Sequence, residues 1–230
     1  MLRAFRFFLM VRLHPTYGLV LLAAIVLIGG WTAWVNPGDL DTGLGMVLFL
    51  QMFLVSTGFA VRAREGHFDP LLTQADSRSR IAAAHCLASV APGVAGWMAL
   101  AVFGVIVGSP AAWSALLGDR MAALAIVSVV GWTAGFLLPR GAAGVVWIAA
   151  LVALLVTRTE VVPAWSQAIE RSLAVAVHAV TVTICPFVLI GVHPPLAPGA
   201  VPIALGMAGL LGWCALRLTR RLDVYLVDRA

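Results

Sequence analysis

The stretch GLGMVLFLQMFLVSTGFAV, residues 43–61, runs directly into RAREGHFDPLLTQADSRSR, residues 62–80. The first stretch has no charged side chain, whereas the second has four arginines and three acids. A nineteen-residue helix covers about 28 Å, which matches the roughly 30 Å hydrocarbon core of a bilayer. We therefore expect the apolar stretch to span a membrane and the polar stretch to form a loop at its surface.

The composition of the whole chain also indicates a membrane protein. Of its 230 residues, 62% are hydrophobic and only 11% are charged, whereas soluble domains carry about a quarter charged residues. So few polar residues cannot cover a globule, and the apolar surface must face lipid. The expectation is an all-α integral membrane protein in which residues 1–230 form a single transmembrane domain.

The basic and sulfur-containing residues exclude several functions. All fifteen basic residues are arginine, and without lysine the chain has neither a P-loop nor a Schiff-base site of its own. A Walker-type ATPase that drives this chain must therefore be a separate chain. Cys86, Cys185 and Cys214 are scattered and form no C-x-x-C motif, which makes a disulfide framework or zinc site unexpected.

Six transmembrane helices account for the apolar segments. The expected spans are residues 17–35, 43–61, 81–107, 121–138, 142–157 and 201–218, and Pro92-Gly93 should break the third softly. Residues 1–15 carry apolar residues on one helical face and arginines on another, which is typical of an interfacial helix. Gly104, Gly108, Gly131 and Gly135 form two G-x-x-x-G pairs that permit close helix packing.

Arginine counts decide how residues 158–200 are interpreted. Six spans place twelve arginines on the cytoplasmic side, with both chain termini, and leave only Arg120, Arg158 and Arg171 outside. This asymmetry follows the positive-inside rule. A seventh span would send the arginines of the C-terminal tail outward, so residues 158–200 are expected to be an external, re-entrant segment.

The polar loop contains its own helix start signal. Asp69-Pro70 places a capping carboxylate before a proline, and Leu71-Leu72 follow. A helix so short needs a surface to pack on, and its apolar tip suits a groove on a partner protein. The alternative is a membrane-surface helix whose arginines contact lipid headgroups.

This loop resembles the signature loop of ABC-2 type transporter permeases, in which Arg-Glu, a small residue, a hydrophobe, an acid, two leucines and Ser-Arg link the second and third spans. The positions that carry the resemblance, and that would couple the chain to an ATPase, are Arg64, Glu65, Gly66, Phe68, Asp69, Leu71, Leu72, Ser77 and Arg78. The sequence departs from the family pattern at His67, where Ser or Thr is usual, and at Ala75, near a usual proline.

The resemblance implies a half-transporter in a bacterial plasma membrane. Two permease chains, identical or homologous, would dock on two ABC ATP-binding subunits, which alone hold ATP and magnesium. No cofactor in this chain and no nucleic-acid partner is implied. The loop would be a coupling helix gripped by the ATPase, and ATP binding would drive export by alternating access.

The transport pathway is less readable from the sequence. Gln51, Ser56 and Thr57 are polar residues of the second span and are candidates to line a cavity between protomers. Their alternative role is hydrogen bonding within or between helices. The spans are otherwise apolar, which favours a hydrophobic or amphiphilic cargo over an ion.

Two other classes of function stay open. His178 and Cys185 offer imidazole and thiol groups that suit copper or haem, as in a metal- or haem-related transport or assembly subunit, although a proline-kinked span explains them equally. An intramembrane enzyme is the other class, but the G-x-S-x, H-E-x-x-H and paired-glutamate motifs are absent.

Overall fold

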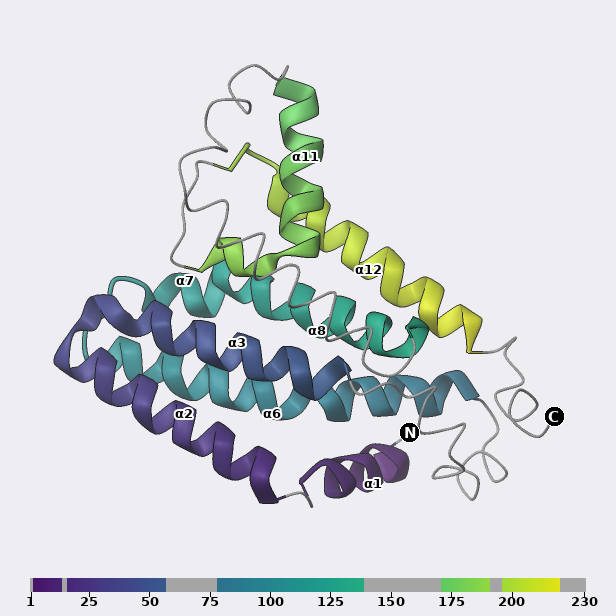
Figure 1. Ribbon diagram of the computed structural model, residues 1–230, viewed down its shortest axis with the longest axis horizontal. Coiled ribbons are helices and arrows are strands. Elements are labelled where there is room, and N and C mark those ends of the chain that lie inside the picture. Colours follow the sequence, from purple (N-terminus) through teal and green to yellow (C-terminus); the bar gives the residue numbers. More distant parts are fainter. Residues whose placement is uncertain (1, 14–15, 57–77, 139–170, 191–195, 220–230) are drawn as a thin grey trace.

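The computed structural model describes residues 2–13, 16–56, 78–138, 171–190 and 196–219, and every regular element in these ranges is helical (Figure 1). The long helices are α2 (Thr16–Val35), α3 (Leu40–Ser56), α6 (Arg78–Ile106), α8 (Asp119–Leu137) and α12 (Ala200–Leu218). The shorter elements are α1 (Leu2–Leu13), the 3-10 turn η1 (Pro37–Asp39), α7 (Ala112–Leu117), α11 (Arg171–Ile184) and the 3-10 turn η2 (Pro186–Leu189). For this part of the chain, the predicted all-α class is confirmed.

Helix α3 lies at the centre of the bundle and contacts α2, α6 and α8 (Figure 1). Its core-facing residues include Leu44 and Leu48, which pack with Trp97 and Leu100 of α6 and with Leu124 of α8. These helices are apolar on nearly all sides, as is typical of helices that have protein on one face and lipid on the other. Helix α12 packs on α8 and α11, while α1 packs on α6.

Among the residues that the structure describes, three helical segments are long and apolar enough to cross a membrane: Ser79–Ile106, Asp119–Leu137 and Ala200–Leu218. They match three of the predicted spans. Segments of α2, α3 and α11 (Leu22–Val35, Leu40–Met52 and Leu173–Ile184) are apolar but shorter. The predicted span 142–157 lies outside the described residues.

Large apolar side chains are exposed along the helices expected to face lipid. On α2, Leu27 and Trp31 are 73% and 70% exposed, and Leu210 of α12 is 61% exposed. An apolar surface of this extent requires lipid or another protein chain to cover it. The structure is therefore compatible with a transmembrane protein.

The predicted soft break in the third span is wrong, because α6 continues as one helix through Pro92. Proline is tolerated in membrane helices, since neighbouring groups compensate for the hydrogen bond it removes. The next residue, Gly93, is also needed for packing, because Gln51 of α3 lies directly against it.

Helices α2, α3, α6 and α8 alternate in direction, and α12 runs in the same direction as α8, so each end of the bundle collects particular residues. One end, which we call the basic end, holds the start of α6 and the last turns of α3, α8 and α12, where Ile81, Val55, Phe136 and Ala215 share one apolar cluster (Figure 1). The charged side chains that the structure describes at this end are Arg3, Arg6, Arg80 and Arg217. The opposite end, which we call the acidic end, has Asp39, Asp41, Asp119 and Arg120.

The turn after α6 was not fully anticipated. Gly104 was correctly expected to allow close packing, since a Cβ there would lie 2.6 Å from Leu40 Cδ2 and 3.2 Å from Ala112 Cβ. Gly108 has nothing within 4 Å of its Cβ position and instead adopts a φ of 74°, which favours glycine. Its role is to end the helix rather than to pack. The short helix α7 that follows was not predicted.

The segment before the last span forms α11 and η2. Helix α11 ends at Ile184, and η2 then places Phe187, Val188 and Leu189 in buried positions against α8. In Figure 1, α11 stands out from the bundle beside the start of α12. The described part of this segment therefore contains two short helical elements, and the expected re-entrant arrangement of residues 158–200 stays a prediction.

Candidate functional site

The predicted coupling residues Arg64, Glu65, Gly66, Phe68, Asp69, Leu71, Leu72 and Ser77 lie outside the described residues, and Arg78 is the first residue of α6. What the structure does describe is where this loop is attached. Helix α3 ends at Ser56 and α6 begins at Arg78, and both lie at the basic end of the bundle. The loop therefore leaves and re-enters the bundle at the same end.

Of the predicted pathway residues, Gln51 is completely buried within the chain. Its Nε2 donates hydrogen bonds to the Ser89 carbonyl oxygen of α6 and to Ser128 Oγ of α8, both at 3.3 Å. Its Oε1 is buried without a hydrogen-bond partner. This geometry gives Gln51 the packing role considered as the alternative, since one amide ties three helices together.

The other two pathway candidates lie near the end of α3. Ser56 is partly exposed, and its backbone lies so close to Gly135 of α8 that a Cβ there would come within 2.3 Å of the Ser56 carbonyl oxygen. The close packing expected at Gly135 is thus confirmed. Thr57 lies outside the described residues.

A buried histidine and two aromatic side chains pack together at the basic end of the bundle. The indole Nε1 of Trp132 donates a hydrogen bond to His85 Nδ1 at 3.3 Å, and His85 is only 1% exposed. Phe8 of α1 packs edge-on against the His85 ring with 5.2 Å between ring centroids. These contacts fix α1 to α6 and α8 next to the attachment of the predicted coupling loop.

A network of polar contacts closes the acidic end. Arg120 at the start of α8 forms a two-point ion pair with Asp41 of α3, with Nε–Oδ1 and Nη2–Oδ2 distances of 2.6 and 2.8 Å, and also donates to Ser114 Oγ. Ser109 Oγ donates to the Pro37 carbonyl oxygen at 2.6 Å. The ion pair and its hydrogen bond therefore join α3, α7 and α8, and the second hydrogen bond links η1 to the turn between α6 and α7.

Replacing Asp41 with asparagine is expected to lower the free energy of unfolding by about 2 kcal/mol, because it leaves the partly buried Arg120 without its charged partner. Thermal unfolding of the purified protein in detergent would measure this. Asp39→Asn is the matched control, since Asp39 is exposed and should change stability little. Equal effects of the two substitutions would contradict the structural role of the ion pair.

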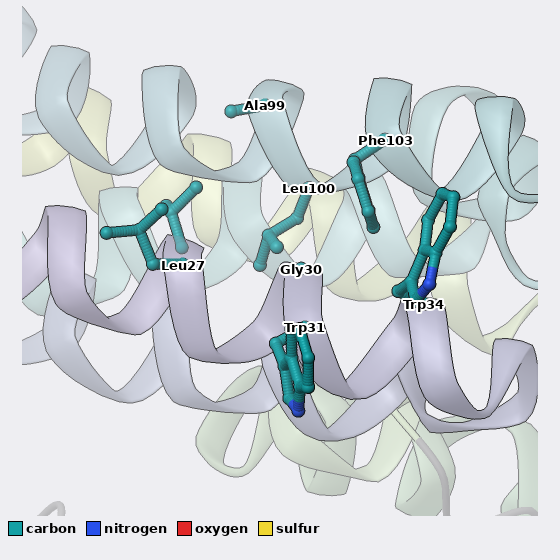
Figure 2. A pocket seen from close by; sticks show the side chains of 8 residues that line it. Leu27, Gly30, Trp31, Trp34, Ala99, Leu100 and Phe103 are labelled. Atoms are coloured by element: carbon teal, nitrogen blue, oxygen red, sulfur yellow. The ribbon is translucent and has the colours of Figure 1, made fainter.

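An apolar groove opens between α2 and α6 (Figure 2). It has a volume of about 420 Å³, and its α6 side is formed by Ala99, Leu100 and Phe103. The α2 side includes Gly30 and two tryptophans, Trp31 and Trp34, that are 70% and 65% exposed. A groove of this chemistry suits an acyl chain or another apolar group rather than an ion.

The groove lies toward the acidic end of the bundle. Trp34 is in the last turn of α2, and Phe103 is in the last turn of α6, with a distance of 6.4 Å between their ring centroids. Exposed tryptophans near helix ends are typical of the membrane–water interface. The groove therefore has an apolar lining and would lie near the membrane–water interface.

The two candidate metal ligands take separate structural roles. His178 Nδ1 accepts a hydrogen bond from the Ala197 amide at 2.9 Å, which links α11 to the turn before α12. Cys185 is buried in the step between α11 and η2. His178 lies within α11 whereas Cys185 follows its end, and no group of three or more metal-ligating side chains occurs among the described residues.

Comparison with known proteins adds no further information: no protein-family model, curated protein or solved structure matches the chain.

Several features of the site were missed from sequence alone. Asp41 and Arg120 are 79 residues apart, and only their expected position on the same membrane side related them. The Trp132–His85 contact and the groove had no sequence signal, because each depends on how two helices face one another.

Proposed function

We propose that this chain is the permease subunit of an ATP-driven ABC-2 type exporter. The observation that carries the proposal is the loop 62–80, a polar segment with the ABC-2 pattern between two long apolar segments. Two such chains, as a homodimer or a heterodimer with a homologue, would bind separate ATP-binding subunits. Those subunits would hold the ATP and magnesium that this chain cannot bind through a P-loop.

The positions of the loop's attachment points support this assignment. Both α3 and α6 meet the loop at the basic end, and arginine-rich ends face the cytoplasm in membrane proteins. An ATP-binding subunit would approach from that side. We therefore place the chain in a bacterial plasma membrane with six spans, residues 158–200 external, and both termini cytoplasmic.

The helix contacts suggest how movement of the loop would be transmitted. Gln51 links α3 to α6 and α8, and Gly135 brings α8 against the last turn of α3. A force applied to the loop would thus move three helices together rather than bend one. Closure of the ATPase subunits would tilt this group between inward-open and outward-open states.

The cargo class follows from the apolar groove between α2 and α6. Its lining has two exposed tryptophans and no charged side chain. It suits a hydrophobic or amphiphilic molecule whose polar part stays near the interface. The direction of transport is proposed as export, because the resemblance is to a family that mostly exports.

Leu72→Arg is expected to abolish ATPase coupling, because a charged side chain at the apolar tip cannot enter a groove on the partner. The chain would be tagged in its native host, purified with its ATP-binding partner, and assayed for bound partner and for ATP hydrolysis. We expect loss of both, by about tenfold or more.

Leu218→Arg is the control, because Leu218 is exposed at the same end of the bundle but belongs to α12. It should retain the partner and ATP hydrolysis. Retention of both by Leu72→Arg would contradict the proposal. Labelling of a Phe68→Cys variant by a membrane-impermeant reagent in intact cells would contradict it as well, since residue 68 would then be external.

A further inference from the structure

A second apolar groove lies between α1 and the first half of α6, outside the site described above. It has a volume of about 600 Å³ and is lined by Leu2 and Phe5 of α1 and by Leu87, Val90, Ala91 and Val94 of α6. The α6 residues are spaced by three and four, so they form one stripe along the helix. From Leu87 to Val94 the stripe is about 10 Å long.

The groove has a fixed shape because α1 is anchored beside it. Phe8 is 1% exposed and contacts His85, which is itself buried and bonded to Trp132. The same helix leaves Leu2 65% exposed at the groove, and Leu87 on the other wall is 50% exposed. A long apolar chain in the groove would cover both residues.

Both helices that form the groove also carry exposed arginines. On α1, Arg6 lies one helical turn from Leu2, and Arg3 is adjacent to it in sequence. On α6, Arg80 lies two turns before Leu87 on the same helical face. All three arginines are exposed, and the groove-lining residues are all apolar.

The depth of the groove matches the boundary of a bilayer. Twenty residues counted back from Ile106, the end of α6, cover about 30 Å and reach Leu87. In a membrane, Leu87 would then lie near the inner boundary and Val94 within the hydrocarbon. Arg80 would lie outside it, at the level of the headgroups.

We propose that this groove binds an anionic phospholipid of the inner leaflet, with an acyl chain along the Leu87–Val94 stripe and its phosphate headgroup between Arg3, Arg6 and Arg80. The occupant is identified by charge complementarity, since a zwitterionic lipid would gain less from three arginines. The inference requires that the chain lies in a bilayer with its basic end on the inner side, and it does not depend on a transport function.

Native mass spectrometry of the full chain, delipidated in detergent, would test the site. Phosphatidylglycerol or phosphatidylcholine is added, and the dissociation constant of the first bound lipid is measured for each. The wild type is expected to prefer phosphatidylglycerol. Each of Arg3→Gln, Arg6→Gln and Arg80→Gln should reduce that preference about fivefold, while Ala91→Trp should weaken first-lipid binding of both lipids at least about tenfold by filling the groove.

Two matched variants control for nonspecific effects. Arg217→Gln removes another exposed arginine of the basic end, and Ala125→Trp adds the same bulk at an exposed position of α8; neither should alter the preference. Equal binding of the two lipids by the wild type would overturn the proposal. It would also be overturned if Ala91→Trp converted a dimer to a monomer with lipid preference unchanged, because the groove would then hold a second copy.

Discussion

Gly135→Ala is expected to lower the free energy of unfolding by about 3 kcal/mol, near the top of the range for overpacking substitutions. A Cβ at this position would lie 2.3 Å from the Ser56 carbonyl oxygen, 2.7 Å from its carbonyl carbon and 2.9 Å from its Cα. These are backbone atoms, so no side chain can rotate away to relieve the contact. The last turn of α3 or α8 itself must move.

Thermal unfolding in detergent, followed by circular dichroism or by loss of a monodisperse elution peak, would measure this effect. Gly209→Ala is the control, because nothing lies within 4 Å of its Cβ position on α12. Gly135→Val should lower the melting temperature more than Gly135→Ala does. Gly209→Val and Gly209→Ala should have similar melting temperatures. Equal melting temperatures for Gly135→Ala and Gly209→Ala would contradict the close approach of α3 and α8.

The second large effect is expected from Gly93→Ala, which should lower the free energy of unfolding by about 2 kcal/mol. A Cβ at Gly93 would lie 2.0 Å from Gln51 Oε1 and 2.3 Å from its Cδ. The buried amide must therefore rotate, and its hydrogen bonds to Ser89 and Ser128 would be lost inside the bundle. Gly45→Ala is a matched control, because its Cβ would meet only Ile190 Cγ2 at 4.0 Å.

A double-mutant cycle with Gln51→Ala tests the cause of this effect. Removing the amide should make Gly93→Ala nearly harmless, so the two substitutions should couple by more than about 1 kcal/mol. The unfolding free energies of the two single variants, the double variant and the wild type supply the cycle. If the two changes in unfolding free energy were strictly additive, Gln51 would not fill the space beside Gly93.

Helix positions were predictable because hydropathy is a local property. The expected spans 17–35, 121–138 and 201–218 agree closely with Thr16–Val35, Asp119–Leu137 and Ala200–Leu218. The prediction failed at Pro92, where a local rule about proline gave way to the packing of α6 against its neighbours. It also missed α7, because a six-residue helix has too few residues for a periodic pattern.

The roles of individual polar residues were less predictable, because several roles fit the same sequence. Gln51 was a candidate for a cavity wall or for helix packing, and only its bonds to α6 and α8 distinguish the two. His178 was weighed as a metal ligand, yet in the structure it accepts a hydrogen bond from the Ala197 amide. Such contacts depend on distances between residues far apart in the chain.

The sequence by itself determined that this is an apolar helical protein with a charged loop between two long apolar segments, because composition and the lengths of apolar runs are set residue by residue. It also determined that the basic residues concentrate in particular connections and tails. Only the tertiary structure decided which helices touch, that Asp41 meets Arg120, and that α1 leaves a groove along α6. Those features arise from the packing of side chains from distant segments, where a single Cβ at Gly135 or Gly93 would prevent the observed contact.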